Sequence, residues 1–158
     1  MPNPLPKFIL FSDFKQWEPY LDWLYKYYLD EIVNAELTFQ GSPIRYRFIP
    51  MTDGKGFGFW HLISEGEDEE KRLPSLERCE RLRWIKWMIQ ESDSNPDILF
   101  YESRRGSSTN LILWNQTIHY VVILGKRNGY YLLVSAYPVS GSRERTFKKE
   151  WLAYHGKG

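Results

Sequence analysis

Apolar side chains recur at three- and four-residue steps near the start of the chain, which predicts an amphipathic helix. The positions that share this spacing are Trp17, Leu21, Leu24, Tyr28 and Ile32. Steps of this size place side chains on one face of a helix. Pro19 is tolerated only in a first helical turn, so we expect the regular part to begin near Glu18.

A second helix is predicted over residues 75–91, with Ser75 as its N-cap. The apolar positions of this segment, which we expect to form its buried stripe, are Leu76, Cys79, Leu82, Ile85, Met88 and Ile89. Arg78, Arg81 and Trp84 follow one another at steps of three, so they are expected to lie side by side next to that stripe.

The remaining apolar runs predict strands. Residues 37–49 alternate around a Gly-Ser-Pro turn, which is typical of a hairpin. Residues 57–63, FGFWHLI, are expected to be an extended or irregular entry to the second half. The segments ILFYE at 98–102 and NLILW at 110–114 are expected to flank a loop, SRRGSST.

Two nearly continuous apolar runs, residues 119–124 and 130–137, are separated by GKRNG. Runs of this kind are typical of strands buried on both faces, so we expect an antiparallel hairpin at the sheet centre. Residues 143–154 predict a short basic helix or an edge strand. The fold class expected is α+β, with an N-terminal helix and hairpin, then a helix on a four-stranded antiparallel sheet.

Length and composition predict one domain. The chain has 158 residues, 42% of them hydrophobic and 26% charged, values that are ordinary for a globular protein. We expect a single domain over residues 1–158, with an extension at about 1–56 and a core at about 57–155. A lone cysteine, Cys79, and an N-terminus without a signal-peptide pattern predict a cytoplasmic protein with no membrane span.

Charge is distributed unequally along the chain. Residues 1–70 carry a formal charge of −6 and residues 71–158 carry +7, which together give the net charge of +1. A polyanion would be attracted to the second half. Alternatively, the two halves neutralise each other in the fold.

Few residues have the spacing of a known catalytic or metal site. His61, His119 and His155 are too scattered for a zinc pattern, and no CxxC, HExxH or phosphate-binding loop is present. We therefore expect neither a metal nor a cofactor. Cys79 lies on the predicted apolar stripe, which argues against a catalytic thiol.

What remains is His61 followed by an arginine-bearing helix. Arg78 and Arg81 border the apolar stripe, from which two guanidiniums could share one anion. Ser135 and Tyr137 alternate on one strand, so they are expected on one face and could bind phosphate oxygens. The alternatives are a structural histidine, a solvated arginine face and two ordinary surface hydroxyls.

Several segments together resemble a known family. FWHLIS, RLPSLERCERLRWIKWMI, YVVILGKRNGYYLLVSAYPV and a basic tail ending in KKEW are similar to a phage- and prophage-associated family of the barnase–EndoU–colicin–RelE-like ribonuclease superfamily. The resemblance covers residues 37–151. It implies a barnase/RelE-like fold and a metal-independent endoribonuclease that acts as a toxin. Ser135 stands where the family's TAY motif is expected to have threonine.

The resemblance also implies residue roles. His61 would be a general acid or base, and Arg78 and Arg81 would stabilise the phosphorane. Ser135 and Tyr137 would orient the phosphate. The second proton-transfer group is left open between Tyr137 and Glu102. Residues expected to contact RNA are Arg104, Arg105, Arg145, Lys148 and Trp84, the last with Trp87 and Trp114 by stacking on bases.

The expected partners are RNA and an acidic antitoxin or immunity protein. Two other functions remain open. One is a non-catalytic RNA- or protein-binding module on the same scaffold. The other is an interaction partner, such as an antitoxin-like or phage accessory protein, that uses the helix at 18–33 and the acidic loop at 65–70.

Overall fold

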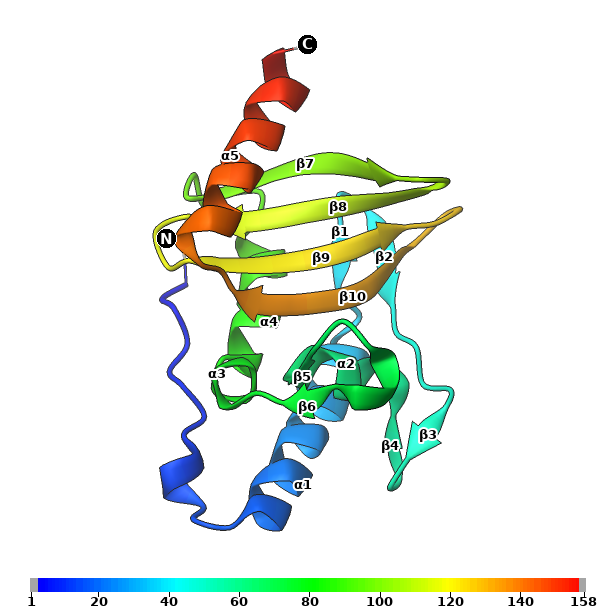
Figure 1. Ribbon diagram of the computed structural model, residues 1–158, viewed down its shortest axis with the longest axis vertical. Helices are drawn as coiled ribbons and strands as arrows, with labels where there is room; N and C mark the ends of the chain where they lie inside the picture. Colours follow the sequence, from blue (N-terminus) through cyan, green and yellow to red (C-terminus); the bar gives the residue numbers. More distant parts are fainter. Residues whose placement is uncertain (1–2, 157–158) are drawn as a thin grey trace.

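A six-stranded sheet lies at the centre of the computed structural model, which describes residues 3–156 (Figure 1). Its order is β1-β2-β10-β9-β8-β7. The strands are β1 (Thr38–Phe39), β2 (Ser42–Arg45), β7 (Ile98–Arg105), β8 (Ser108–Asn115), β9 (Tyr120–Lys126) and β10 (Tyr131–Pro138). The α+β class is confirmed, and β9 and β10 form the central pair as predicted.

The sheet is larger than the four antiparallel strands that we expected. Strands β7 to β10 are antiparallel to their neighbours. The predicted N-terminal hairpin then joins the same sheet, because β2 runs parallel to β10. The prediction is therefore not confirmed as it stands: the sheet has six strands, and one pairing is parallel.

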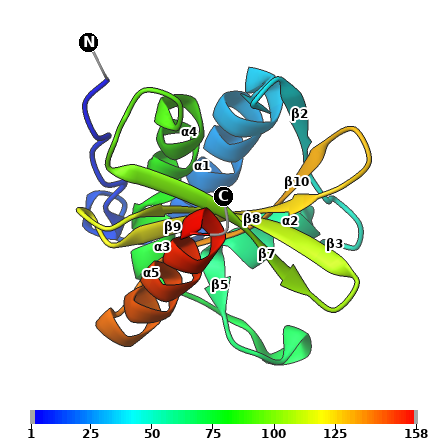
Figure 2. The ribbon, with the colours of Figure 1, turned by 90° about the horizontal axis from the view of Figure 1, so that it is seen from above.

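Helices cover both faces of the sheet. The predicted first helix is α1 (Trp17–Tyr27), which continues as a π-helix (Tyr28–Ile32) and a 3₁₀ turn (Val33–Ala35). Together with α4 (Leu82–Glu91) it lies on one face, and α5 (Gly141–Gly156) lies on the other (Figure 2). The tail is thus a helix rather than an edge strand.

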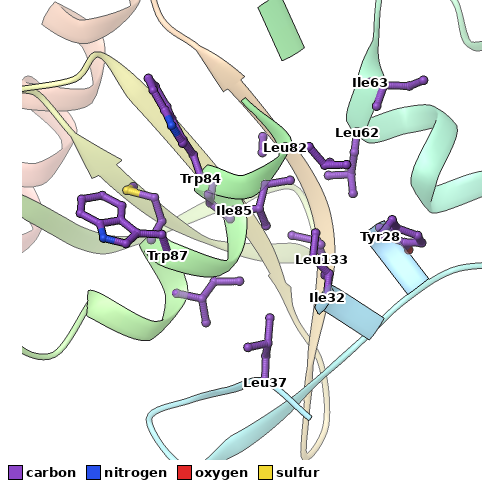
Figure 3. Packing of buried hydrophobic residues seen from close by; sticks show 14 of the residues in the cluster. Tyr28, Ile32, Leu37, Leu62, Ile63, Leu82, Trp84, Ile85, Trp87 and Leu133 are labelled. Carbon is purple, nitrogen blue, oxygen red and sulfur yellow. The ribbon is translucent and has the colours of Figure 1, made fainter. Parts of the chain in front are cut away.

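The main core lies between the sheet and the helices α1 to α4, among them α2 (Phe57–Ile63) and α3 (Leu76–Glu80). Figure 3 shows Tyr28 and Ile32 from the first helical segment, Leu62 and Ile63 from α2, and Trp84 and Ile85 from α4 around Leu133 of β10. A smaller cluster on the opposite face packs Phe147 of α5 against sheet residues that include Trp114. Burial of both faces explains the nearly continuous apolar runs of β9 and β10.

Two predictions of local structure are wrong. Residues 57–63 form a helix, α2 (Phe57–Ile63), rather than an extended segment, because the apolar residues Phe59, Leu62 and Ile63 recur at helical steps and are all buried. The predicted helix at 75–91 is broken at Arg81, whose φ of −102° and ψ of 14° separate α3 (Leu76–Glu80) from α4.

The loops are shorter than the sequence indicated. The expected loop at 103–109 is a tight turn, since β7 and β8 continue to Arg105 and Ser108. Two small hairpins flank α2: β3 (Met51–Thr52) with β4 (Lys55–Gly56), and β5 (Ser64–Glu65) with β6 (Leu73–Pro74). Between β5 and β6 lies a 3₁₀ turn (Glu69–Lys71).

No helix within residues 3–156 is long and apolar enough to cross a membrane.

The edge of β10 is where the candidate site is built. β2 pairs only with Tyr131 and Leu132, and the register of β10 against β9 shifts between Leu133 and Ser135. Beyond that bulge the outer edge of β10 has no strand beside it. Helices α2 and α3 pack along this edge instead (Figure 1), and they bring His61 and Arg78 to it.

Candidate functional site

His61 lies on α2, with its side chain 17% exposed and stacked on Phe57 at a ring-centroid distance of 5.8 Å. Its Nδ1 lies 3.6 Å from Oε1 of Glu69. Within the described chain this nitrogen is buried and has no hydrogen-bond partner. A small approach of the two groups would let Nδ1–H donate to the carboxylate and leave Nε2 as a proton acceptor.

The surroundings of His61 favour its neutral form. Burial lowers the pKa of His61, and Arg72 and Arg78 lower it further, while Glu69 opposes them. A histidine whose pKa lies below its usual range is neutral near pH 7. It can therefore accept a proton, as a general base must.

Two guanidiniums converge beside the imidazole. Arg72 and Arg78 both donate to the carbonyl oxygen of Ser64, and Arg72 also donates to those of Gly66, over 2.6 Å, and His61, over 3.1 Å. The ion pairs found within residues 3–156 include neither arginine. Burial and, after it, the charge of Arg72 lower the pKa of Arg78. Positive charge is thus concentrated here without a bound carboxylate.

Tyr137 joins this cluster, whereas Ser135 does not. The guanidinium carbon of Arg78 lies 4.9 Å from the ring centroid of Tyr137, a cation–π contact. Ser135 and Tyr137 pair with Ile123 and Val121, so they share one face of β10 as predicted. Ser135 is only 7% exposed, and neither Ser135 nor Tyr137 lines a depression next to His61.

His61 lies between two depressions of different charge. One, of about 420 Å³, is lined by carboxylates on residues 53, 69 and 70 as well as by Arg72. The other, of about 230 Å³, is lined by Arg47 and Arg127 with a single carboxylate, Glu69. An anionic ligand would therefore reach His61 more favourably from the second depression.

Arg81 does not join Arg78. Because the helix breaks at Arg81, its guanidinium turns away and lies over the rings of Phe8 and Trp84, at 4.8 and 5.3 Å. It also donates to the carbonyl oxygen of Glu77. The expectation that the two arginines share one anion is corrected by this break.

The tryptophans proposed for base stacking belong to the core. Trp84, Trp87 and Trp114 are 5%, 8% and 2% exposed. The indole of Trp84 donates to the carbonyl oxygen of Pro6 and that of Trp87 to Asn3. None of these rings is open to an unpaired base, so the structure corrects that expectation, including the RNA-binding role of Trp84.

The other basic residues lie elsewhere. Arg104 and Arg105 are exposed at the β7–β8 turn and line depressions that His61 does not reach. Arg145 and Lys148 lie on α5 near His119. Glu102 is on the edge strand β7, where it pairs with Lys126 at 3.0 Å rather than with the neighbouring arginines.

The surroundings of Cys79 and the placement of possible metal ligands bear on thiol and metal chemistry. Cys79 is fully buried, and burial raises the pKa of its thiol to about 12, which opposes thiolate formation. The described residues contain no group of three or more His, Cys, Asp or Glu side chains that could hold a metal ion.

Sequence reasoning missed Arg72 and Glu69. Glu69 belongs to the acidic loop at 65–70, which was considered only as a possible contact with another protein, and Arg72 follows that loop. The small β5–β6 hairpin folds this segment back, so that Arg72 reaches the end of α2. Arg72 stands two residues before Pro74, but nothing in that spacing indicates which backbone carbonyls it binds.

Comparison with family models, curated proteins and solved structures finds no match to this chain. The implications of the resemblance therefore remain predictions. The arrangement of His61, Arg72, Arg78 and Tyr137 is the geometry from which a function can be argued.

Proposed function

We propose that the protein is a metal-independent endoribonuclease with His61 at its centre. One observation carries this proposal: a largely buried imidazole with a lowered pKa lies beside two guanidiniums that form no ion pair within residues 3–156. Such a set can remove a proton from a hydroxyl and stabilise the charge that then develops on phosphorus.

In the proposed reaction, Nε2 of His61 accepts the proton of a ribose 2′-hydroxyl. The 2′-oxygen attacks the adjacent phosphorus, and the bond from phosphorus to the 5′-oxygen breaks. Arg78 and Arg72 stabilise the pentacoordinate intermediate through guanidinium hydrogens that do not contact backbone carbonyls. The products are a 2′,3′-cyclic phosphate and a 5′-hydroxyl, once the leaving oxygen has gained a proton.

Tyr137 is the better candidate for the group that gives this proton. Its ring lies under Arg78, which would bring a bound phosphate near the phenol. Glu102 lies on β7, separated from β10 by β8 and β9, and it is paired with Lys126. Of the two groups left open by the sequence, we therefore propose Tyr137.

The charges around His61 suggest the path of the RNA strand. Arg47, Arg127 and Glu69 line the depression on one side, whereas Asp53, Glu69, Glu70 and Arg72 line the other. We propose that the strand enters over Arg47 and Arg127, because that side has more cationic groups and fewer carboxylates to repel phosphates.

The biological setting is also a proposal. Four consecutive antiparallel strands with helices packed on them are compatible with a barnase/RelE-like core, to which β1 and β2 would be additions. A toxin of this kind would act in the cytoplasm. It would need an acidic antitoxin or immunity protein that covers the basic residues.

A second candidate function is a binding module without catalysis. The observation in its favour is that Arg72 and Arg78 already bind backbone carbonyls. Both arginines could then serve chiefly to hold the β5–β6 hairpin against α2. In that case RNA or a protein would bind without being cleaved.

The test is cleavage of total bacterial RNA in excess EDTA by the wild type, by His61→Ala and by His155→Ala. His155 is an exposed histidine near the end of α5, so its variant controls for loss of an imidazole as such. We expect His61→Ala to lose about 10²–10⁴-fold in rate while remaining folded, and cleaved ends to carry 2′,3′-cyclic phosphate. Equal cleavage by His61→Ala would remove His61 from the mechanism, and binding without cleavage by any of the proteins would favour the second function.

A further inference from the structure

A second histidine is held by a carboxylate at the opposite end of the central strands. Nδ1 of His119 lies 2.6 Å from Oε1 of Glu144. The other oxygen, Oε2, accepts a hydrogen bond of 3.0 Å from Nε1 of Trp114, and the Glu144 side chain is only 14% exposed. A carboxylate fixed by a buried indole orients the imidazole, because a rotation of the carboxylate would break both contacts.

The backbone at His119 is fixed as well. The turn between β8 and β9 is closed by Asn115, whose Oδ1 accepts hydrogen bonds from the amides of Thr117 and Ile118. The carbonyl oxygen of His119 accepts a hydrogen bond of 2.9 Å from the amide of Val139. His119 itself has a φ of 56°, a left-handed conformation that is uncommon outside glycine and that is concentrated at functional positions.

Cationic side chains lie next to this imidazole. Arg145 and Lys148 are three residues apart on α5, so their side chains project from neighbouring positions on the helix surface. They line a depression of about 220 Å³ together with Trp114, Gln116, His119 and Glu144. Neither cation belongs to an ion pair in the part of the chain that the structure describes.

We propose that His119, Arg145 and Lys148 form a binding site for a phosphate group. Nδ1 of His119 is occupied by Glu144, while the ring is 62% exposed, so Nε2 is the nitrogen that is left for a ligand. An N–H at Nε2 of an imidazole, a guanidinium and an ammonium can each donate to phosphate oxygens. Glu144 also lines the depression, but its two oxygens are engaged by His119 and Trp114, so we assign it a positioning role rather than a contact with the ligand.

This site is separate from the one around His61. The two sets of lining residues have no member in common. One of the depressions beside His61 includes Leu132–Val134 of β10, whereas the carbonyl of His119 binds the amide of Val139, beyond the other end of that strand. The inference therefore stands whether or not the protein cleaves RNA.

The test is isothermal titration calorimetry at low ionic strength with inorganic phosphate, a 5′-phosphorylated RNA oligonucleotide and its 5′-hydroxyl counterpart. The variants are Lys148→Gln and, as a matched control, Lys149→Gln, which removes the same charge from an exposed position outside the depression. We expect Lys148→Gln and Arg145→Gln to weaken phosphate binding about tenfold each, as loss of a charge-assisted hydrogen bond does, and Lys149→Gln to change it by less than about twofold.

The two RNA arms separate the sources of the phosphate. Binding of the phosphorylated oligonucleotide alone identifies a terminal phosphate, and equal binding of both identifies the phosphodiester backbone. Absence of phosphate binding by the wild type, or an equal loss in Lys148→Gln and Lys149→Gln, overturns the site.

Glu144 needs a measurement that reports orientation. In Glu144→Gln, we expect the NMR shift of Nδ1 of His119 to change, because Nδ1–H loses its carboxylate acceptor, and phosphate binding to weaken. Unchanged shifts in a folded variant would overturn the positioning role of Glu144.

Discussion

Gly58 determines how closely α2 approaches the chain that follows β2, and its substitution is the most direct test of how His61 is placed. The amide of Gly58 donates to the carbonyl oxygen of Arg47 over 2.7 Å. A Cβ at this position would lie 2.8 Å from that same oxygen and 3.4 Å from the hydroxyl of Tyr28. The nearest obstacle is backbone, which cannot rotate away, so α2 must move in Gly58→Ala.

The change in the free energy of unfolding follows from two destabilising contributions and one stabilising contribution. Overpacking of a buried contact costs about 1–3 kcal/mol, and a strained or broken buried hydrogen bond costs about 1–3 kcal/mol more. Alanine offsets about 0.5–1 kcal/mol through its better helix propensity. We therefore expect Gly58→Ala to lower the free energy of unfolding by about 1–5 kcal/mol, because the steric and hydrogen-bond costs outweigh the gain in helix propensity.

Urea unfolding followed by circular dichroism measures this change. At about 2–4 °C per kcal/mol for a domain of this size, the melting temperature should also fall. Gly141→Ala is the matched control, since Gly141 is exposed and a Cβ there meets only Nη1 of Arg145, at 3.8 Å. If Gly58→Ala were as stable as the wild type, the close approach of α2 to Arg47 would be refuted. A displaced α2 should also reduce RNA cleavage, because His61 lies one turn further along the same helix.

Two further predictions concern stability. Burial and two arginines lower the pKa of His61, so the unfolded chain binds more protons than the folded one when pH falls below the usual histidine value of about 6.5. The free energy of unfolding should therefore fall in that pH range, and it should fall less in His61→Asn. Urea midpoints at neutral and mildly acidic pH measure both changes. Equal losses in both proteins would contradict the lowered pKa. Trp84→Ala should lower the free energy of unfolding by about 3–5 kcal/mol, as for other buried aromatics. The reason is that Trp84 is 5% exposed and its ring centroid lies 5.2 Å from that of Tyr120. Near wild-type stability would contradict the place of Trp84 in the core.

Local patterns predicted most of the elements. The helical spacing from Trp17 to Ile32 and the apolar runs of β9 and β10 are each long enough for their period to be read without tertiary information. The Ser75 cap is also confirmed, since its Oγ accepts a hydrogen bond from the amide of Arg78. Residues 57–63 form only two helical turns, which is too short a segment for its period to separate helix from strand.

The candidate site was predicted only in part. His61, Arg78 and Tyr137 were identified from their residue types; Arg78 acts on the pKa of His61 and contacts the ring of Tyr137, while their roles stay predictions. Arg81 was grouped with Arg78 on the assumption of one continuous helix, and a single residue outside helical φ and ψ separates them. Arg72 was missed because its partners are backbone carbonyls, which leave no trace in the spacing of side chains.

The sequence by itself determined the α+β class, the central β9–β10 pair and the amphipathic faces, because these depend on periods that repeat within a few residues. Only the tertiary structure decided which residues distant along the chain meet. It placed the tryptophans in the core, brought Arg72 to His61, and set Glu144 of α5 against His119. Such meetings depend on where β10 loses its neighbouring strand and on how a short hairpin folds back. The local spacing of apolar residues predicts neither feature, since both follow from packing between segments far apart in sequence.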